Sequence, residues 1–129
     1  DLTKRTAVDL RAVAESHNEA IVASVSPAEK PRKVPALEAE PVLIHRVAYS
    51  DIDFNRHVNT MRYIEMMLDV LPIERFAEER PMRLDINFLK ESRYGETLSV
   101  AVEERGGETL VAIRNDAGAT ICRGAFEWR

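Results

Sequence analysis

The sequence contains a single cysteine, Cys122, and no long run of apolar residues. One cysteine cannot form a disulfide within the chain, which favours a reducing compartment. No stretch approaches the roughly 20 apolar residues that a membrane-spanning helix needs, and no secretory signal pattern opens the chain. We therefore expect a soluble, cytoplasmic protein without a membrane partner.

The chain also lacks an excess of positive charge. Its 22 acidic residues outnumber its 18 lysines and arginines, which gives a net charge of -4. General nucleic-acid binding needs a basic face, so we expect no nucleic acid among the partners. Repeats and low-complexity tracts are absent too. A length of 129 residues with 45% hydrophobic content is enough for one globular domain with a real core.

Residues 49–71 combine a polar pattern with an apolar one. Polar side chains occupy every second position of the first half, which places them on one side of an extended segment: Asp51, Asp53, Asn55, His57 and Asn59. Beyond Asn59, apolar residues recur every three or four positions, as in a buried helix with Asn59 as its N-cap and Pro72 at its end. Backbone N–H groups at a helix N-terminus favour developing negative charge, which suits acyl transfer or hydrolysis.

The remaining sequence predicts a sheet around this helix. Residues 42–48 alternate between apolar and polar side chains, as a strand does. Four strand-like runs follow the helix and are separated by turn signals: 82–91, 97–105, 108–115 and 119–129. Their connections are short, so we expect them to be antiparallel neighbours. The predicted fold class is α+β, an antiparallel sheet of about five strands wrapped round one central helix.

The regions outside this sheet give weaker signals. Residues 1–25 carry an apolar pattern that could form one or two short helices. Residues 26–41 hold four of the six prolines, which excludes a helix or a central strand there. We therefore assign residues 1–41 to an N-terminal linker segment with a possible short helix, and residues 42–129 to the folded domain. Residues 73–80 predict a short charged helical piece.

Asp53, Asn55 and His57 are the first candidates for catalysis. A general base or water-orienting group, an amide that fixes it, and a carboxylate that polarises a carbonyl or holds the imidazole tautomer are ordinary parts of hydrolysis without a covalent intermediate. The alternative is a turn in which these side chains only cap backbone groups before the helix. A metal site built from Asp51, Asp53 and His57 is disfavoured, because no second histidine or cysteine lies at ligand spacing.

Three further side chains are weighed in the same way. Glu91 follows an apolar strand and could reach the polar cluster as a general base, or it could be a strand-end charge in solvent. Cys122 lies inside the last strand and is interpreted as a small buried hydrophobe rather than a nucleophile. His45, in the first strand of the domain, is expected to face solvent or a partner chain.

Residues 51–59 resemble the active-site segment of the acyl-ACP thioesterases, fatty-acyl hydrolases built from two hot-dog domains. The pattern Asp-x-Asn-x-His-Val-Asn of that family is matched by residues 53–59, and Tyr63 follows downstream. The matching residues are Asp53, Asn55, His57, Val58 and Asn59. The later segment that supplies a catalytic glutamate resembles the run Asn-Phe-Leu-Lys-Glu-Ser, which places this role on Glu91. Some members carry a cysteine after this glutamate, whereas this chain has Ser92, so a thiol mechanism through that position is excluded.

The resemblance implies a hot-dog fold and hydrolysis of fatty acyl-ACP in fatty acid biosynthesis, with no cofactor. The implied catalytic residues are Asp53, Asn55, His57 and Glu91, and the implied substrate-binding residues are Asn59 and Tyr63. Either His57 or Glu91 would activate the water. The resemblance covers only the second half of the family's length, so residues 42–129 would be the second of two hot-dog domains.

The implied partner is acyl carrier protein with its acyl-phosphopantetheine arm. A basic face that would attract this acidic protein is available if four residues converge: Arg56, Arg62, Lys90 and Arg93. We also expect a homodimer, or pairing with a missing N-terminal hot-dog domain, and incomplete activity of this chain alone. Two alternatives stay open: a single-domain acyl-CoA thioesterase acting as a homodimer, and a non-catalytic acyl-binding or assembly domain.

Overall fold

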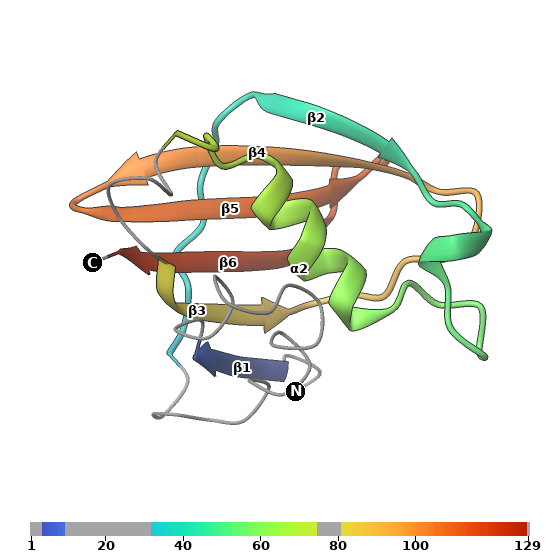
Figure 1. Ribbon diagram of the computed structural model, residues 1–129. Coiled ribbons are helices and arrows are strands. Elements are labelled where there is room, and N and C mark those ends of the chain that lie inside the picture. The colour runs from blue at the N-terminus through green and yellow to red at the C-terminus, as the bar shows by residue number, and fades with distance from the viewer. Residues whose placement is uncertain (1–3, 10–31, 75–80, 129) are drawn as a thin grey trace.

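The computed structural model describes residues 4–9, 32–74 and 81–128. The elements follow in this order: β1 (Lys4–Asp9), β2 (Pro41–Arg46), the 3-10 turn η1 (Tyr49–Asp51), α2 (Thr60–Asp69), β3 (Pro81–Phe88), β4 (Thr97–Arg105), β5 (Glu108–Asn115) and β6 (Thr120–Trp128). The strands form one antiparallel sheet in the order β1-β3-β6-β5-β4-β2, and α2 crosses one face of it (Figure 1). The predicted sheet wrapped round one helix is confirmed, with β1 as an additional strand.

Helix α2 begins and ends close to the predicted positions. Asn59 is its N-cap, because the side-chain oxygen accepts a hydrogen bond from Met61 N at 2.9 Å. The side chains of Tyr63, Ile64 and Met67 are buried against the sheet, and each large apolar side chain contributes roughly 1.5–3 kcal/mol when fully buried. Within the described residues, no helix has the length and apolar character that a membrane crossing requires.

The predicted strands at residues 97–105 and 108–115 have the observed bounds of β4 and β5. Gly106 and Gly107 make this possible, since their φ angles of 59° and 86° are the two positive values that a tight hairpin turn needs. The β5–β6 hairpin places Ile113 opposite Cys122, and its register shifts between Ile113 and Arg114. The alternation of these strands places large apolar side chains such as Val111 and Ile113 under α2.

The predicted order of the strands was wrong for β3. This strand pairs with β6, and β4 has β2 as its outer neighbour. The link of residues 89–96 must therefore cross from one side of the sheet to the other. Three inter-strand spacings of about 4.8 Å separate β3 from β4, and an extended link of this length reaches farther than that. A short connection thus does not enforce pairing, and this crossing decides where Glu91 lies.

The predicted helical character was also wrong for residues 4–9. They form strand β1, which pairs with β3 from Lys4 opposite Phe88 to Asp9 opposite Arg83. The pairing satisfies backbone groups on the outer edge of β3 that would otherwise be open. The sheet therefore extends into the segment predicted as a linker. The rest of the predicted N-terminal helices and most of residues 73–80 lie outside the described residues; Ile73 and Glu74 form a turn.

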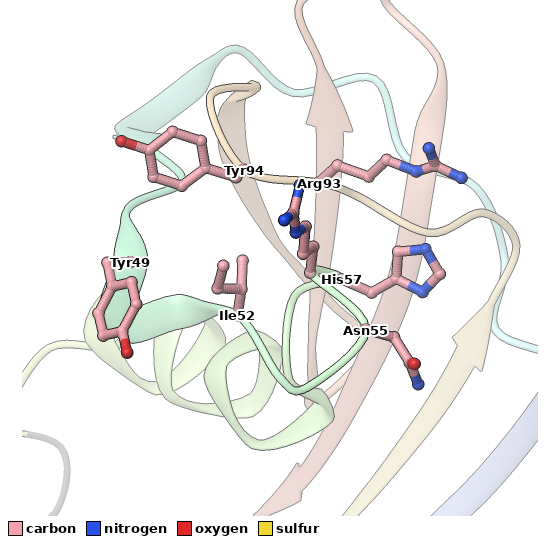
Figure 2. Close-up of a pocket in the computed structure, with 7 residues that line it drawn as sticks. Tyr49, Ile52, Asn55, His57, Arg93 and Tyr94 are labelled. Atoms are coloured by element: carbon pink, nitrogen blue, oxygen red, sulfur yellow. The ribbon is translucent and has the colours of Figure 1, made fainter.

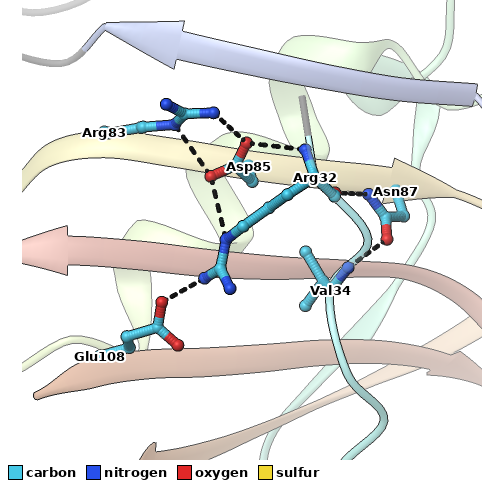
Figure 3. A network of polar contacts seen from close by, with 6 residues as sticks. All are labelled: Arg32, Val34, Arg83, Asp85, Asn87 and Glu108. Atoms are coloured by element: carbon cyan, nitrogen blue, oxygen red, sulfur yellow. Dashed lines mark hydrogen bonds and ion pairs between the residues drawn. The ribbon is translucent and has the colours of Figure 1, made fainter. Parts of the chain in front are cut away.

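Residues 32–40, here called the strap, run across the face of the sheet opposite α2 without helix or strand structure, as predicted for a linker. Val34 and Leu37 of the strap are buried in a second apolar cluster formed mostly by small residues of the sheet: Ala101, Leu110, Ala112 and Ala125. Asn87 fixes the strap to β3, because its side chain accepts from Val34 N at 2.6 Å and donates to Arg32 O at 3.0 Å (Figure 3).

Candidate active site

The polar segment before α2 is a tight hairpin rather than an extended run. Ile52 and Val58 form a bridge at its base, and Asp53 N donates to His57 O at 2.8 Å. Arg56 N donates to Asp53 O at 3.0 Å and closes the turn. Among the described residues, Arg56 is the one non-glycine residue with a positive φ, 65°. The hairpin, residues 52–58, therefore projects from the N-terminus of α2.

His57 and Glu91 meet at this hairpin. The Nδ1 atom of His57 lies 3.0 Å from Oε2 of Glu91, and His57 forms an antiparallel bridge with Arg93. Their side chains are 27% and 72% exposed, respectively, so the pair is accessible to water. When Nδ1–H of His57 donates a hydrogen bond to the Glu91 carboxylate, Nε2 of the neutral ring is unprotonated and can take a proton from water. The crossing of residues 89–96 thus brings together two of the candidate catalytic residues, which lie on distant segments of the sequence.

Asp53 shapes the hairpin. Its Oδ1 accepts hydrogen bonds from Asn55 N at 2.8 Å and from His57 N at 3.2 Å, as in a capped Asx turn. This is the arrangement weighed above as the alternative to catalysis. Asp53 is nevertheless exposed, and within the described residues its Oδ2 makes no hydrogen bond. The carboxylate can therefore fix the backbone of His57 with one oxygen and face solvent with the other.

An open groove of about 590 Å³ runs beside the pair. It is lined by Tyr49, Ile52, Asn55, Arg56, His57, Arg93 and Tyr94. Figure 2 shows Tyr49 and Tyr94 at one end of the groove and Asn55 and His57 at the other. Aromatic and apolar walls next to an amide, an imidazole and two guanidinium groups suit a ligand with both apolar and polar parts.

Asn59 and Tyr63 contact the backbone of segments next to the site in this structure. Asn59 uses its amide oxygen to cap α2. Tyr63 is 4% exposed, and its hydroxyl oxygen accepts a hydrogen bond from Ser92 N at 3.1 Å, which fixes the residue after Glu91. Burial raises the pKa of Tyr63 to about 12. The assignment of both residues to substrate binding stays a prediction.

A second polar group, centred on Asp51, was missed by the sequence reasoning. The side chain of Asp51 is 1% exposed; Oδ2 lies 2.7 Å from His45 Nε2, and Oδ1 accepts from Arg62 Nε at 2.8 Å. Burial raises the pKa of this carboxyl, but the N–H of Ala48 and the bonds from His45 and Arg62 outweigh burial and hold the pKa below its usual range. Asp51 therefore stays ionised inside the protein.

Two sequence expectations change as a result. Asp51 does not share a side with Asp53 and Asn55, because the chain turns at η1 and directs the Asp51 carboxylate inward. His45 is only 30% exposed and bonds to Asp51 rather than simply facing solvent. The signal that could have located His45 is its alternation with Leu43, since both lie on the face of β2 that turns toward the core.

The remaining candidates have clear positions. Cys122 is buried, and burial raises its pKa, so the thiol is not a nucleophile at ordinary pH. In the part of the chain that the structure describes, no three acidic, histidine or cysteine side chains converge as a metal site would require. The predicted basic face forms in part: Arg56 and Arg93 line the groove, whereas Arg62 is engaged by Asp51 and Glu65.

Comparison with known proteins gives one family and several relatives. The model of the acyl-ACP thioesterase C-terminal domain matches residues 36–129. The chloroplastic acyl-[acyl-carrier-protein] hydrolase FATB3 of Cuphea viscosissima is 30% identical over 87 residues, which are 63% of this chain and 21% of that protein. The chloroplastic dodecanoyl-[acyl-carrier-protein] hydrolase of Cinnamomum camphora is 23% identical over 87 residues, which are 63% of this chain and 23% of that protein.

Two solved structures are similar to this fold. An acyl-ACP thioesterase from Bacteroides thetaiotaomicron superposes with a TM-score of 0.74 and 33% identity, over 84% of this chain and 47% of that one. The 12:0-ACP thioesterase from Umbellularia californica superposes with a TM-score of 0.68 and 19% identity, over 82% of this chain and 42% of that one. These likenesses confirm the hot-dog fold. The chain spans less than a quarter of the length of the curated relatives and less than half of either solved chain.

Proposed function

Because the chain belongs to the family of acyl-ACP thioesterase C-terminal domains, we propose that it hydrolyses the thioester of fatty acyl groups carried on acyl carrier protein. The observation that carries this proposal is the contact of His57 Nδ1 with Glu91 Oε2 at 3.0 Å, at one end of an open groove. A histidine fixed by a carboxylate is a standard general base, and such a base accelerates a reaction by about 10²–10⁴-fold.

In the proposed reaction, Glu91 holds the Nδ1 proton of His57 and Nε2 takes a proton from a water in the groove. The water oxygen forms a bond to the thioester carbonyl carbon. The electrons of the C=O double bond move to the carbonyl oxygen, which becomes an oxyanion. When the carbonyl re-forms, the C–S bond breaks and the sulfur leaves as a thiol after taking the proton from His57. The products are a free fatty acid and the thiol of the carrier arm.

Asn55 and Asp53 assist in different ways. The Asn55 side chain lines the groove next to His57, where its amide can orient the attacking water or the thioester carbonyl. Asp53 acts chiefly through the backbone, because its carboxylate accepts from the N–H groups of Asn55 and His57 and so fixes the hairpin that carries both. Its negative charge lies on the same hairpin as the His57 imidazole, which becomes positive during the reaction.

The groove also supports an acidic carrier-protein partner. The chain has a net charge of -4, which would repel such a partner, but Arg56 and Arg93 place positive charge at the groove. The exposed aromatic side chains of Tyr49 and Tyr94 offer apolar surface to the phosphopantetheine arm at the end away from His57. Both relatives named above are acyl-[acyl-carrier-protein] hydrolases.

Assembly and location are part of the same proposal. The edge strand β2 exposes Val42 and Ile44, which suits pairing with a second copy or with another hot-dog domain. The solved relatives are about twice as long as the part this chain matches. A role in fatty acid biosynthesis follows from the reaction. The cytoplasmic location rests on the single buried cysteine; the plant relatives carry the word chloroplastic in their names.

Hydrolysis assays test the proposal. We expect the chain to release free thiol from acyl-ACP, and the variants His57→Ala and Glu91→Gln to lose at least about tenfold in kcat. Asp116→Asn, in the exposed β5–β6 turn, is the control and should leave kcat unchanged. If His57→Ala and Glu91→Gln both match the wild-type rate, these residues do not carry the reaction.

The choice of substrate separates the alternatives. Faster turnover of acyl-CoA than of acyl-ACP by the chain alone would favour a self-sufficient acyl-CoA thioesterase. Binding of acyl thioesters without turnover, in the chain alone and after addition of the N-terminal half of the Bacteroides thetaiotaomicron relative, would favour a non-catalytic acyl-binding domain. Restored turnover on that addition would support pairing of two hot-dog domains.

A further inference from the structure

We infer that Asp51 is a positioning residue for the reaction: its buried carboxylate, held between His45 of β2 and Arg62 of α2, fixes the base of the hairpin that presents His57 to Glu91. The consequence for turnover rests on the proposed function. The mechanical role of Asp51 rests only on its contacts, and it can be measured whether or not the chain is an active hydrolase.

Asp51 binds three separate parts of the fold. Its Oδ2 accepts from Ala48 N at 2.7 Å and lies 2.7 Å from His45 Nε2, which ties the start of η1 to the edge strand β2. Its Oδ1 accepts from Arg62 Nε at 2.8 Å, which ties the same residue to the first turn of α2. Arg62 is itself held by Glu65 through a 2.8 Å contact. One side chain therefore joins β2, η1 and α2.

Asp51 also closes the base of the hairpin through its backbone. Its carbonyl oxygen accepts a hydrogen bond from Asn59 N at 2.8 Å, just outside the bridge between Ile52 and Val58. The chain between these contacts carries Asp53, Asn55 and His57. Glu91 lies on a different segment, the link of residues 89–96. The distance from His57 to Glu91 therefore depends on where the base of the hairpin is held.

Replacement by asparagine would disturb this arrangement without changing its size. Both carboxylate oxygens of Asp51 now act as acceptors, whereas an amide has one acceptor oxygen and one NH₂ group that can only donate. In either orientation of the amide, its NH₂ group would face a donor, either Arg62 Nε or the Ala48 N–H. A displacement of the order of 1 Å at a catalytic group can cost about 10²-fold in rate.

Asp85 supplies a matched control on the opposite face of the sheet. Its side chain is equally inaccessible at 4% exposed, and it pairs with Arg83 Nη2 at 2.9 Å and with Arg32 Nε at 3.4 Å, while Arg32 also pairs with Glu108 (Figure 3). Asp85→Asn thus removes a buried carboxylate that holds arginines, as Asp51→Asn does. It leaves the hairpin untouched, because Asp85 contacts the strap and β3 rather than η1 or α2.

The kinetic experiment compares these variants at a temperature where urea titration shows each to be folded. We expect Asp51→Asn to lower kcat about tenfold or more with KM changed by less than about twofold, and Asp85→Asn to leave kcat unchanged. His45→Gln, which keeps a side-chain N–H donor for Asp51, should retain the rate, while His45→Leu should lose it. Equal kcat values for Asp51→Asn and Asp85→Asn would overturn the inference.

A spectroscopic measurement covers the case in which the wild-type chain hydrolyses nothing. Ring nitrogen chemical shifts of His57 in ¹⁵N-histidine spectra report its contact with Glu91 directly. We expect Asp51→Asn and His45→Leu to move these shifts and Asp85→Asn to leave them in place. Unmoved His57 shifts in a folded Asp51→Asn variant would reject the positioning role, whereas absent turnover with moved shifts would reject only the proposed reaction. If Asp51→Asn does not fold, the pair His45→Leu and His45→Gln decides.

Discussion

Neighbouring carboxylates in this protein have different roles because the backbone turns between them. Asp51 points inward, is bonded on both oxygens and stays ionised; Asp53 points outward and caps the hairpin with one oxygen. An alternating sequence pattern describes both in the same way, since it assumes an extended chain. His57 of the hairpin lines the groove, and the contacts of both aspartates are with groups that hold the hairpin in place.

Tyr63 gives a prediction for alkaline pH. Burial raises its pKa from 10.0 to about 12, so the folded state favours the neutral phenol. This stabilisation is complete at a pH below the pKa of Tyr63 in the unfolded state. It is lost as the pH rises through the pKa of Tyr63 in the folded state. We expect the free energy of unfolding, measured by urea titration at about pH 8 and about pH 11, to fall less in Tyr63→Phe than in the wild type. Tyr94→Phe, at an exposed position, should behave like the wild type; equal falls in all three proteins would contradict the assignment.

Sequence patterns identified the candidate residues of the site more readily than the contacts between them. Residues 51–59 stood out because polar side chains precede a helical stripe. The position of Glu91 beside His57 could not be derived from its own strand, because a strand-end glutamate in solvent has the same local pattern as a general base. The pairing depends on the crossing of residues 89–96, which is a property of the whole sheet.

At the scale of elements, the N-cap of α2 carries a prediction that separates two roles of Asn59. Asn59→Ala should lower the free energy of unfolding by about 1 kcal/mol, because Met61 N loses its side-chain acceptor. Asn59→Asp should keep the cap and the stability, since aspartate caps helices equally well. Urea titration measures the free energy of unfolding of both variants, and acyl-ACP hydrolysis measures their kcat. A fall in kcat for a fully stable Asn59→Asp variant would support the predicted contact with substrate, and an unchanged kcat would restrict Asn59 to capping.

Gly124 of β6 gives a second prediction about an element, because α2 approaches the sheet closely there. A Cβ atom at this position would lie 2.6 Å from Met67 Sδ and 3.1 Å from Leu84 Cδ1. We expect Gly124→Ala to destabilise the protein by about 1–3 kcal/mol, the usual cost of overpacking. In a Met67→Ala background the same substitution should cost less, since the sulfur is gone. Thermal unfolding of the four proteins measures this coupling; additive effects would show that Met67 is not the obstacle.

Most elements of the fold followed from local patterns, and the exceptions have a common cause. Residues 97–105 and 108–115 were located correctly because Gly106 and Gly107 mark the turn between two alternating runs. The neighbour of β3 and the existence of β1 depended on contacts between distant segments. Residues 4–9 have no strong alternation of their own, so only the open edge of β3 explains their strand conformation.

At the scale of the whole molecule, the exposed edge of β2 predicts association. Ile44 is 63% exposed and Val42 is 61% exposed on a strand whose outer side pairs with no other described strand. We expect the chain to form a two-fold dimer through this edge, and Ile44→Lys to shift it to monomer. Sedimentation velocity at micromolar concentration measures both, with Ile73→Lys as a control at an equally exposed position outside the sheet. A wild-type chain that sediments as a monomer would contradict this prediction.

The strap limits the directions in which copies of the protein can be added. Helix α2 crosses one face of the sheet and residues 32–40 cross the other, so further sheets cannot stack directly on either face along these paths. Among the described residues, the sheet edges open to another copy are those of its two end strands, β1 and β2. Joining β2 to β2 alone closes after two copies, whereas joining β1 to β2 would repeat without limit and give a fibre. The chemical difference between the two edge strands is therefore what separates a finite particle from a one-dimensional polymer.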